Sequence, residues 1–441
     1  MTDDLTIATI RRRIAAMITD PDGLPATRPD PASVSPAAAR SALGPAVPLL
    51  PQFLFIIAVN GQSLAVGFKG NPLTPGLTNP HPDRILKVAG LDVRLGLASD
   101  AATNPVLDRD TITDFEPLVS EHGTGGTDFG VTVCEGIGAG ILEQLDTVIG
   151  IRPRILFYVI GRGGQPYSTL KKGTNAYAND MAAMDRICQV ARSKGWTPIA
   201  LATVLKHGEA DGANTTYKAD LVAWQADKNA DYKAITGQAG DIPFIMTQPS
   251  AFSQGNYLSG LAMLEAMEED PDTFAVVTPD YPLMGLYDAD RTHFTGPGYY
   301  DLGCDYIARG LLQQVLGTGA KALRINRDDV EWDGTTLRFG FHIPTRPIAV
   351  DTVAIPDPGN WGFVFKDDSG DLPVDTMSLV DRDTRVAVTF TRAATTNRVI
   401  EFALKGYPIG QVKVIANQPR GCIRDSSPGA KNFLLHFRQP F

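Results

Sequence analysis

Residues 53–63 read FLFIIAVNGQS, and this stretch gives the first indication of the fold that we expect for the chain. Its first seven residues are all apolar, which is typical of a strand buried on both faces of a parallel sheet. The run ends abruptly in NGQS, which places the hydroxyl of Ser63 where a buried strand would leave its sheet. Ser63 therefore either terminates the strand or acts as a nucleophile, and the choice between these roles depends on which other residues the chain places near it.

Four more apolar runs follow, and each is predicted to be a strand: RILFYVIG (154–161), PIALATVL (198–205), IPFIMTQ (242–248) and FAVVTPD (274–280). Helix-like segments are expected between and around these runs at about 135–149, 176–194, 216–237 and 257–268. A further segment, residues 299–317, has apolar residues at helical spacing and is expected to be the closing helix. Apolar strands alternating with helices predict an α/β fold, a parallel sheet with helices on both faces.

The composition and hydrophobic pattern of the sequence differ at its two ends from those of the middle. Residues 1–50 are rich in Pro and Ala and are expected to form an extended arm. From residue 319 to 441 short alternating runs such as TLRFGFHI and RVAVTFT are separated by Gly, Pro, Asp and Asn, which predicts an antiparallel β-sandwich. The catalytic chemistry is therefore expected within residues 51–318. Aromatic residues of the sandwich are expected in its core rather than on a sugar-stacking surface; they are Trp332, Trp361, Phe363 and Phe365.

Composition limits the partners of the chain. The 441 residues carry a formal net charge of -9, which argues against a nucleic-acid partner because such binding depends on clustered Lys and Arg. The four cysteines lie far apart and form no C-x-x-C pair, so neither zinc nor a redox dithiol is expected. No window approaches the roughly 18 apolar residues of a membrane span, and no export signal is evident. We expect either an intracellular protein or one that leaves the cell by a route such as lysis.

Polar residues follow the predicted strands at the edge where parallel strands end, which is where open α/β sheets bind ligands. Ser63 follows the first strand, and the loop after the last strand carries Asp290 and His293 within DADRTH. A spacing of three lets the aspartate reach Nδ1 of its histidine while Nε2 points toward Ser63. A serine hydroxyl becomes a nucleophile when a base takes its proton and a carboxylate orients that base. These residues therefore predict a hydrolytic triad.

Each part also has a simpler explanation. A serine after a buried strand commonly caps a turn, and Asp-x-x-His is common in loops. Their joint appearance at one edge, in the order Ser, Asp, His, favours catalysis over a turn. His207, Glu209 and Asp211 alternate along the chain and offer a weak metal signal, but without a second histidine nearby we expect a polar network and no metal site.

These motifs resemble those of the SGNH hydrolases, in particular the sialate O-acetylesterase and carbohydrate esterase family six branch. The resemblance covers about residues 53–316 and rests on five stretches: GQSL (61–64), FGVTVCEGI (129–137), GRGGQPY (161–167), KHGEAD (206–211) and DADRTH (288–293). It implies a flavodoxin-like sheet, with Ser63 as nucleophile, His293 as base and Asp290 as the group that orients the base. No cofactor is implied.

The resemblance also implies an oxyanion hole and a substrate site. The oxyanion would be held by the backbone amides of Ser63 and Gly130 and by the side chain of His207, which stands where the family usually has glutamine. Residues expected to bind the substrate are Gln62, Gly163, Gly164 and Glu209.

The expected activity is removal of O-acetyl groups from a carbohydrate through an acyl-enzyme on Ser63. The alternative is a noncatalytic or weakly active glycan-binding component of a viral tail or baseplate that keeps an esterase fold. A complete triad favours the enzyme, since a binding module needs none of it. The expected partner is an acetylated glycan, and assembly as a homo-oligomer or on a virion particle is compatible with the sequence. The missing export signal favours delivery by a phage.

Overall fold

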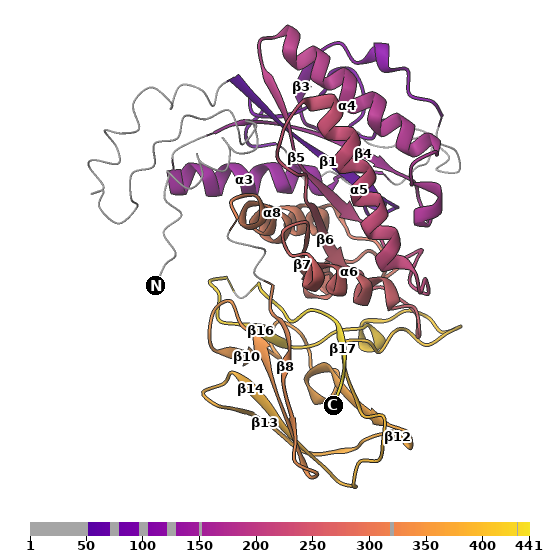
Figure 1. The fold of residues 1–441 in the computed structure, drawn as a ribbon, viewed down its shortest axis with the longest axis vertical. Helices are drawn as coiled ribbons and strands as arrows, with labels where there is room; N and C mark the ends of the chain where they lie inside the picture. Colours follow the sequence, from indigo (N-terminus) through magenta and orange to yellow (C-terminus); the bar gives the residue numbers. More distant parts are fainter. Residues whose placement is uncertain are drawn as a thin grey trace, which may run out of the picture.

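The computed structural model describes residues 52–441 apart from 71–78, 97–104, 121–128, 150–151, 318–321 and 430. The predicted arm, residues 1–50, lies outside the described residues. The predicted fold class is confirmed: a mostly parallel sheet carries helices on both faces, and separate antiparallel sheets follow it in the chain (Figure 1).

The central sheet has seven strands in the order β3-β2-β4-β1-β5-β6-β7. Their bounds are β1 (Phe53–Gly61), β2 (Ile85–Val88), β3 (Phe115–Pro117), β4 (Arg154–Gly161), β5 (Thr197–Lys206), β6 (Phe244–Gln248) and β7 (Phe274–Pro279). The strands pair in parallel except β3, which is antiparallel to β2. All five strands expected from the sequence are present, and their order β4-β1-β5-β6-β7 is the flavodoxin-like one. The short strands β2 and β3, at one side of the sheet, were not expected.

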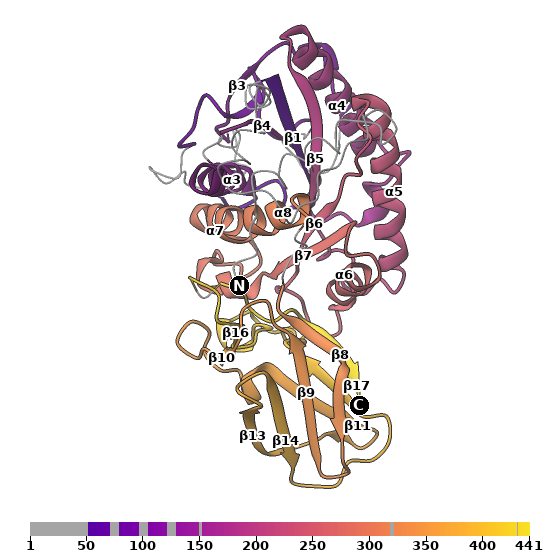
Figure 2. The same ribbon diagram turned by 60° about the vertical axis from the view of Figure 1, so that its left-hand side comes forward.

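Helices cover both faces of this sheet (Figure 2). One face carries α4 (Asn175–Ser193), α5 (Tyr217–Thr236) and α6 (Leu258–Glu269). The other face carries α3 (Val133–Ile149), α7 (Gly296–Asp301) and α8 (Ala308–Val315), with a π-helical turn at Leu302–Ile307 joining the last two. The expected closing helix is therefore present, but its hydrogen-bond pattern changes within it. Short 3₁₀ turns lie at Arg109–Thr111, Tyr167–Thr169, Tyr281–Leu286, Asn360–Gly362 and Ile415–Asn417.

The antiparallel part forms two four-stranded sheets and one two-stranded sheet, in the orders β13-β14-β9-β8, β12-β11-β15-β17 and β10-β16. The strand bounds are β8 (Arg324–Trp332), β9 (Thr336–His342), β10 (Ile348–Val350), β11 (Phe363–Asp367), β12 (Gly370–Asp371), β13 (Val374–Val380), β14 (Arg385–Phe390), β15 (Val399–Phe402), β16 (Ile423–Asp425) and β17 (Phe437–Pro440). The ring of Phe339 in β9 packs on Phe363 and Phe365 in β11, which joins the larger sheets face to face. Both β11 rings are buried, as expected for core residues.

The antiparallel part packs against the α/β part next to α6 and β7 (Figure 1). Gln248, at the end of β6, exchanges two hydrogen bonds with the backbone of His436, of 2.7 and 3.1 Å. The Ser250 hydroxyl lies 2.7 Å from Nε2 of His436, and the Tyr281 hydroxyl donates to the Leu434 carbonyl. Because these groups are buried, their hydrogen bonds resist competition from water.

Among the helices described, none is long and apolar enough to cross a membrane.

Strand β1 positions the serine of the opening motif. All nine of its residues are buried, and it pairs with β4 on one side and β5 on the other. At its end Gly61 lies beside Lys206 of β5 and adopts a φ of +148°, a backbone conformation that favours glycine. A Cβ at Gly61 would stand 1.9 Å from the Lys206 carbonyl oxygen. The close approach of the two strands therefore requires a glycine two residues before Ser63.

We expect Gly61→Ala to destabilise the protein by about 3 kcal/mol, because the new methyl group overlaps a backbone carbonyl that cannot rotate away. Gly90→Ala is the matched control, since Gly90 also has a positive φ but a Cβ added there would meet nothing within 4 Å. The control should lose only about 1 kcal/mol. Urea unfolding of both variants measures the difference, and equal midpoints would contradict the steric explanation.

Candidate active site

The structure brings the three predicted triad residues together. Ser63 follows β1, while Asp290 and His293 lie in the loop between Tyr281–Leu286 and α7. Nε2 of His293 lies 2.7 Å from the Ser63 hydroxyl, and Nδ1 lies 2.7 Å from Oδ2 of Asp290. These contacts form a continuous chain from carboxylate to hydroxyl. A proton can therefore pass from Ser63 to an imidazole that the carboxylate orients.

The loop that carries Asp290 and His293 is closed by local hydrogen bonds. Oδ1 of Asp290 accepts from the backbone amides of Thr292 and His293, both at 2.9 Å. Arg291, which follows Asp290 directly, has a φ of +54°, and the amide of Asp288 donates to the His293 carbonyl. Burial alone would raise the pKa of Asp290, but the hydrogen bonds from the His293 ring and the two amides outweigh it and hold that pKa below its usual range. Asp290 therefore stays ionised beside the imidazole.

A second aromatic ring fixes the plane of the imidazole. Phe68 packs edge-on against His293, with ring centroids 4.9 Å apart. The amide of Phe68 donates to the Ser63 carbonyl at 3.0 Å, so the same residue contacts both members of the pair. Phe68 also bridges to Phe129, which leads into α3. The turn after the serine thus supports the base as well as the nucleophile.

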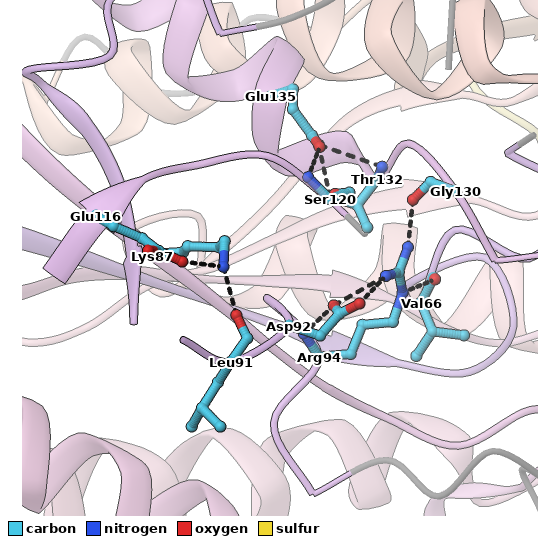
Figure 3. Close-up of polar contacts among 10 residues, drawn as sticks. All are labelled: Val66, Lys87, Leu91, Asp92, Arg94, Glu116, Ser120, Gly130, Thr132 and Glu135. Atoms are coloured by element: carbon cyan, nitrogen blue, oxygen red, sulfur yellow. Dashed lines mark hydrogen bonds and ion pairs between the residues drawn. The ribbon is translucent and has the colours of Figure 1, made fainter. Parts of the chain in front are cut away.

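Arg94 ties together the two segments beside the serine (Figure 3). Its guanidinium is buried, Nε donates to the Val66 carbonyl, and Nη2 donates to the Gly130 carbonyl. Nη1 makes two hydrogen bonds of 2.9 Å to the carboxylate of Asp92, which balances the buried charge. Arg94 was not expected from the sequence, because it lies outside the motifs and reaches its partners only in the fold.

The predicted oxyanion donors differ in their availability. No described residue accepts a hydrogen bond from the backbone amide of Ser63, so that donor is free to bind an oxyanion. The amide of Gly130 instead donates to the Gly67 carbonyl at 3.2 Å, as part of the bridge between Phe68 and Phe129. The expectation that Gly130 supplies an oxyanion donor is therefore not supported, because its proton is already used.

The role expected of His207 also needs correction. The residue is fully buried, with Nε2 3.0 Å from the Gln165 carbonyl and Nδ1 2.7 Å from the Tyr217 hydroxyl. A carbonyl only accepts, so Nε2 carries the ring proton and Nδ1 accepts from the tyrosine. Burial lowers the pKa of His207, which favours this neutral form. No ring proton is left for an oxyanion, and His207 belongs to a polar network.

The four residues expected to bind substrate lie at the same edge of the sheet, but they differ in whether their polar atoms already have hydrogen-bond partners. Oε1 of Gln62 already accepts from the Ala210 amide, so this side chain is used in holding the β5 loop. Gly163 and Gly164 form an open turn after β4. Glu209 pairs with Lys206 through Oε1, while its buried Oε2 has no partner among the described residues. Glu209 is thus the one of the four whose side chain has an unused acceptor.

Two further groups at this edge were not expected. Arg162 follows Gly161, which pairs with Gly61, and within the described ranges its buried Nε has no acceptor. Lys206 is fully buried between Glu209 and Asp280, at 3.0 and 2.8 Å. Burial would lower the pKa of Lys206, but the two carboxylates outweigh it and raise that pKa, so the lysine stays charged.

In the described part of the chain, no cluster of His, Cys, Asp and Glu has an arrangement suited to a metal ion.

Comparison with known proteins supports the fold. No protein-family model and no curated protein matches the chain. A carbohydrate acetylesterase from Xanthomonas citri matches 87% of this chain and 80% of its own, with a TM-score of 0.52 and 14% identity. At this identity the likeness shows a shared fold.

Two solved structures match a shorter part of the chain. A protein from Arabidopsis thaliana matches 60% of this chain and 100% of its own, with a TM-score of 0.39 and 17% identity. NanS matches 60% of this chain and 98% of its own, with a TM-score of 0.41 and 17% identity.

We expect His207→Ala to lower the free energy of unfolding by about 2–4 kcal/mol, because it empties a buried site and leaves the Tyr217 hydroxyl and the Gln165 carbonyl without partners. Any kcat that the wild type shows on a small ester should stay within about fivefold in the folded variant, whereas loss of an oxyanion donor would cost about 10²–10³. Urea unfolding and steady-state kinetics on a small ester measure the two effects. A selective loss of kcat at unchanged stability would restore His207 as an oxyanion donor.

Proposed function

We propose that the protein is a serine esterase that removes O-acetyl groups from a carbohydrate. The observation that carries this proposal is the unbroken hydrogen-bond chain from Asp290 through His293 to Ser63, beside a serine amide that is free to bind an oxyanion. A module that only binds glycan gains nothing from this chain. The fold shared with a carbohydrate acetylesterase is compatible with the proposal.

In the proposed mechanism the Ser63 hydroxyl attacks the ester carbonyl carbon while Nε2 of His293 takes its proton. The resulting oxyanion accepts a hydrogen bond from the Ser63 amide, and the tetrahedral intermediate collapses when His293 returns the proton to the departing sugar oxygen. Water then attacks the acetyl-enzyme while His293 takes its proton; the bond between the acyl carbon and Oγ of Ser63 breaks, His293 returns the proton to Oγ, and acetate leaves. Asp290 remains an anion throughout and stabilises the imidazolium.

The edge around Ser63 favours a substrate rich in hydroxyl groups. Oε2 of Glu209 is a buried acceptor and Nε of Arg162 a buried donor, and neither has a partner among the described residues. Such groups gain from a ligand that supplies both donors and acceptors, as a sugar does. The turn at Gly163 and Gly164 adds no apolar side chain. These features fit an acetylated polysaccharide; that the polysaccharide belongs to a bacterial surface and is reached by a phage-borne enzyme is a further part of the proposal.

Replacing Ser63 or His293 tests the reaction. We expect Ser63→Ala and His293→Ala each to remove nearly all hydrolysis of a small acetyl ester, because the nucleophile and its base act as a unit. The double variant should be little worse than either single variant. Circular dichroism of each variant checks that the fold is intact. Substantial turnover by purified Ser63→Ala would remove the nucleophile from this position.

A substrate series tests the class of ester. We expect acetyl esters to be hydrolysed faster than butyryl esters and much faster than octanoyl esters, and acetate to be released from at least one acetylated polysaccharide. Each additional buried CH₂ contributes about 0.8 kcal/mol only where an apolar channel receives it. Release of acetate and fatty acid is measured side by side with Ser63→Ala as the blank. A preference for octanoyl over acetyl would point to a lipid ester instead.

A further inference from the structure

A segment of the antiparallel part reaches the loop that carries the proposed base. Tyr407 pairs with the loop after β6, since its amide donates to the Phe252 carbonyl and its carbonyl accepts from Gln254, at 3.0 and 2.9 Å. Gly406 is packed so closely that a Cβ there would lie 2.6 Å from the backbone of Ser253. The segment from Tyr407 to Lys413, which we call the 407–413 segment, is therefore anchored on the α/β part at one end.

Both ends of the 407–413 segment contact the loop between Asp290 and His293. The Tyr407 hydroxyl lies 3.4 Å from the carbonyl of Arg291, the residue with positive φ. Nζ of Lys413 donates to Oγ1 of Thr292 at 2.6 Å. These contacts are made to Arg291 and Thr292, the two residues that lie between Asp290 and His293 in the sequence.

Thr292 transmits the contact to the aspartate. Its hydroxyl accepts from Lys413 and lies 3.3 Å from the Asp290 carbonyl, to which it donates. Its amide donates to Oδ1 of the same aspartate at 2.9 Å. The position of the Thr292 side chain is thus coupled to the orientation of the Asp290 carboxylate, which in turn orients His293.

Lys413 is also placed where its charge acts on the site. The residue is half-buried, and burial lowers the pKa of its amine, while Asp290 and Glu209 oppose that change. Asp290 and Glu209 are thus the two carboxylates that act on this lysine, and Arg291 is the neighbouring cation on the loop. A positive charge held here helps Asp290 to remain an anion.

We propose that Lys413 is a positioning residue for the triad, supplied by the antiparallel part of the chain. It holds Thr292 so that the loop keeps Asp290 and His293 in the geometry that activates Ser63. The inference rests on the esterase function proposed above. It predicts that the antiparallel part contributes directly to the rate of the reaction, in addition to any binding of polymer.

Kinetics of five variants test the proposal. We expect Lys413→Met to lower kcat on a small acetyl ester about tenfold with KM changed less than about twofold, because small displacements of catalytic groups act mainly on the transition state. Lys413→Arg should recover most of the rate, since it restores a cationic donor. Thr292→Val should behave like Lys413→Met, and the double variant should be no worse than either single variant. Lys405→Met, at an exposed lysine of the same region, is the matched control and should match wild type.

Amide hydrogen exchange supplies a readout that does not need turnover. Exchange in residues 288–294 should be faster in Lys413→Met than in wild type, and unchanged in Lys405→Met. Equal exchange in this loop, additive effects of Lys413→Met and Thr292→Val, or an equal loss of kcat in Lys405→Met would each overturn the proposal. If wild type hydrolyses no ester, the proposed function fails, and the exchange experiment still decides whether Lys413 holds the loop.

Discussion

The site depends on one close approach, that of the end of β1 to the end of β5. Gly61 lies against the backbone of Lys206 so tightly that no side chain fits between them, and the amide of Gln62 donates to the Lys206 carbonyl. Because β1 is buried between β4 and β5, its end cannot shift without breaking two sets of hydrogen bonds. Ser63 therefore leaves the sheet at a defined point, and every other group of the site is positioned relative to it.

A buried ionic cluster supports the same edge from β5 and β7. Lys206 lies between Glu209 and Asp280, and such a cluster stabilises the fold only when the charges remain paired. Burial alone would raise the pKa of Glu209, but Lys206 outweighs it and lowers that pKa. For Asp280, burial is the largest effect and raises the pKa. The pair Lys206 and Glu209 is thus the charged core of the cluster, and Oε2 of Glu209 remains without a partner among the described residues at the edge of the sheet where β1 and β5 end.

The antiparallel part is integrated with the site rather than merely attached to the chain. Its last strand region is buried against β6 through His436, and the 407–413 segment lies over the loop of Asp290 and His293. Contacts between parts of a chain that bury polar groups in both are costly to open. This arrangement gives a physical reason why the two parts are expected to move and unfold together.

The class of fold could be predicted from the sequence alone, and so could the three residues that we propose as the triad. Apolar runs that alternate with helical segments predict a covered parallel sheet, and the ends of its strands meet at one edge. Ser63, Asp290 and His293 could therefore be expected to lie close together. Which of the expected oxyanion donors are free could be seen only in the tertiary structure. His207 and Gly130 have the right positions in their motifs, but partners distant in sequence occupy their protons. Arg94 and Lys413 belong to no motif. Their hydrogen bonds are made to a carbonyl and a hydroxyl that are remote in sequence, so these contacts could not be predicted before the folded structure was known.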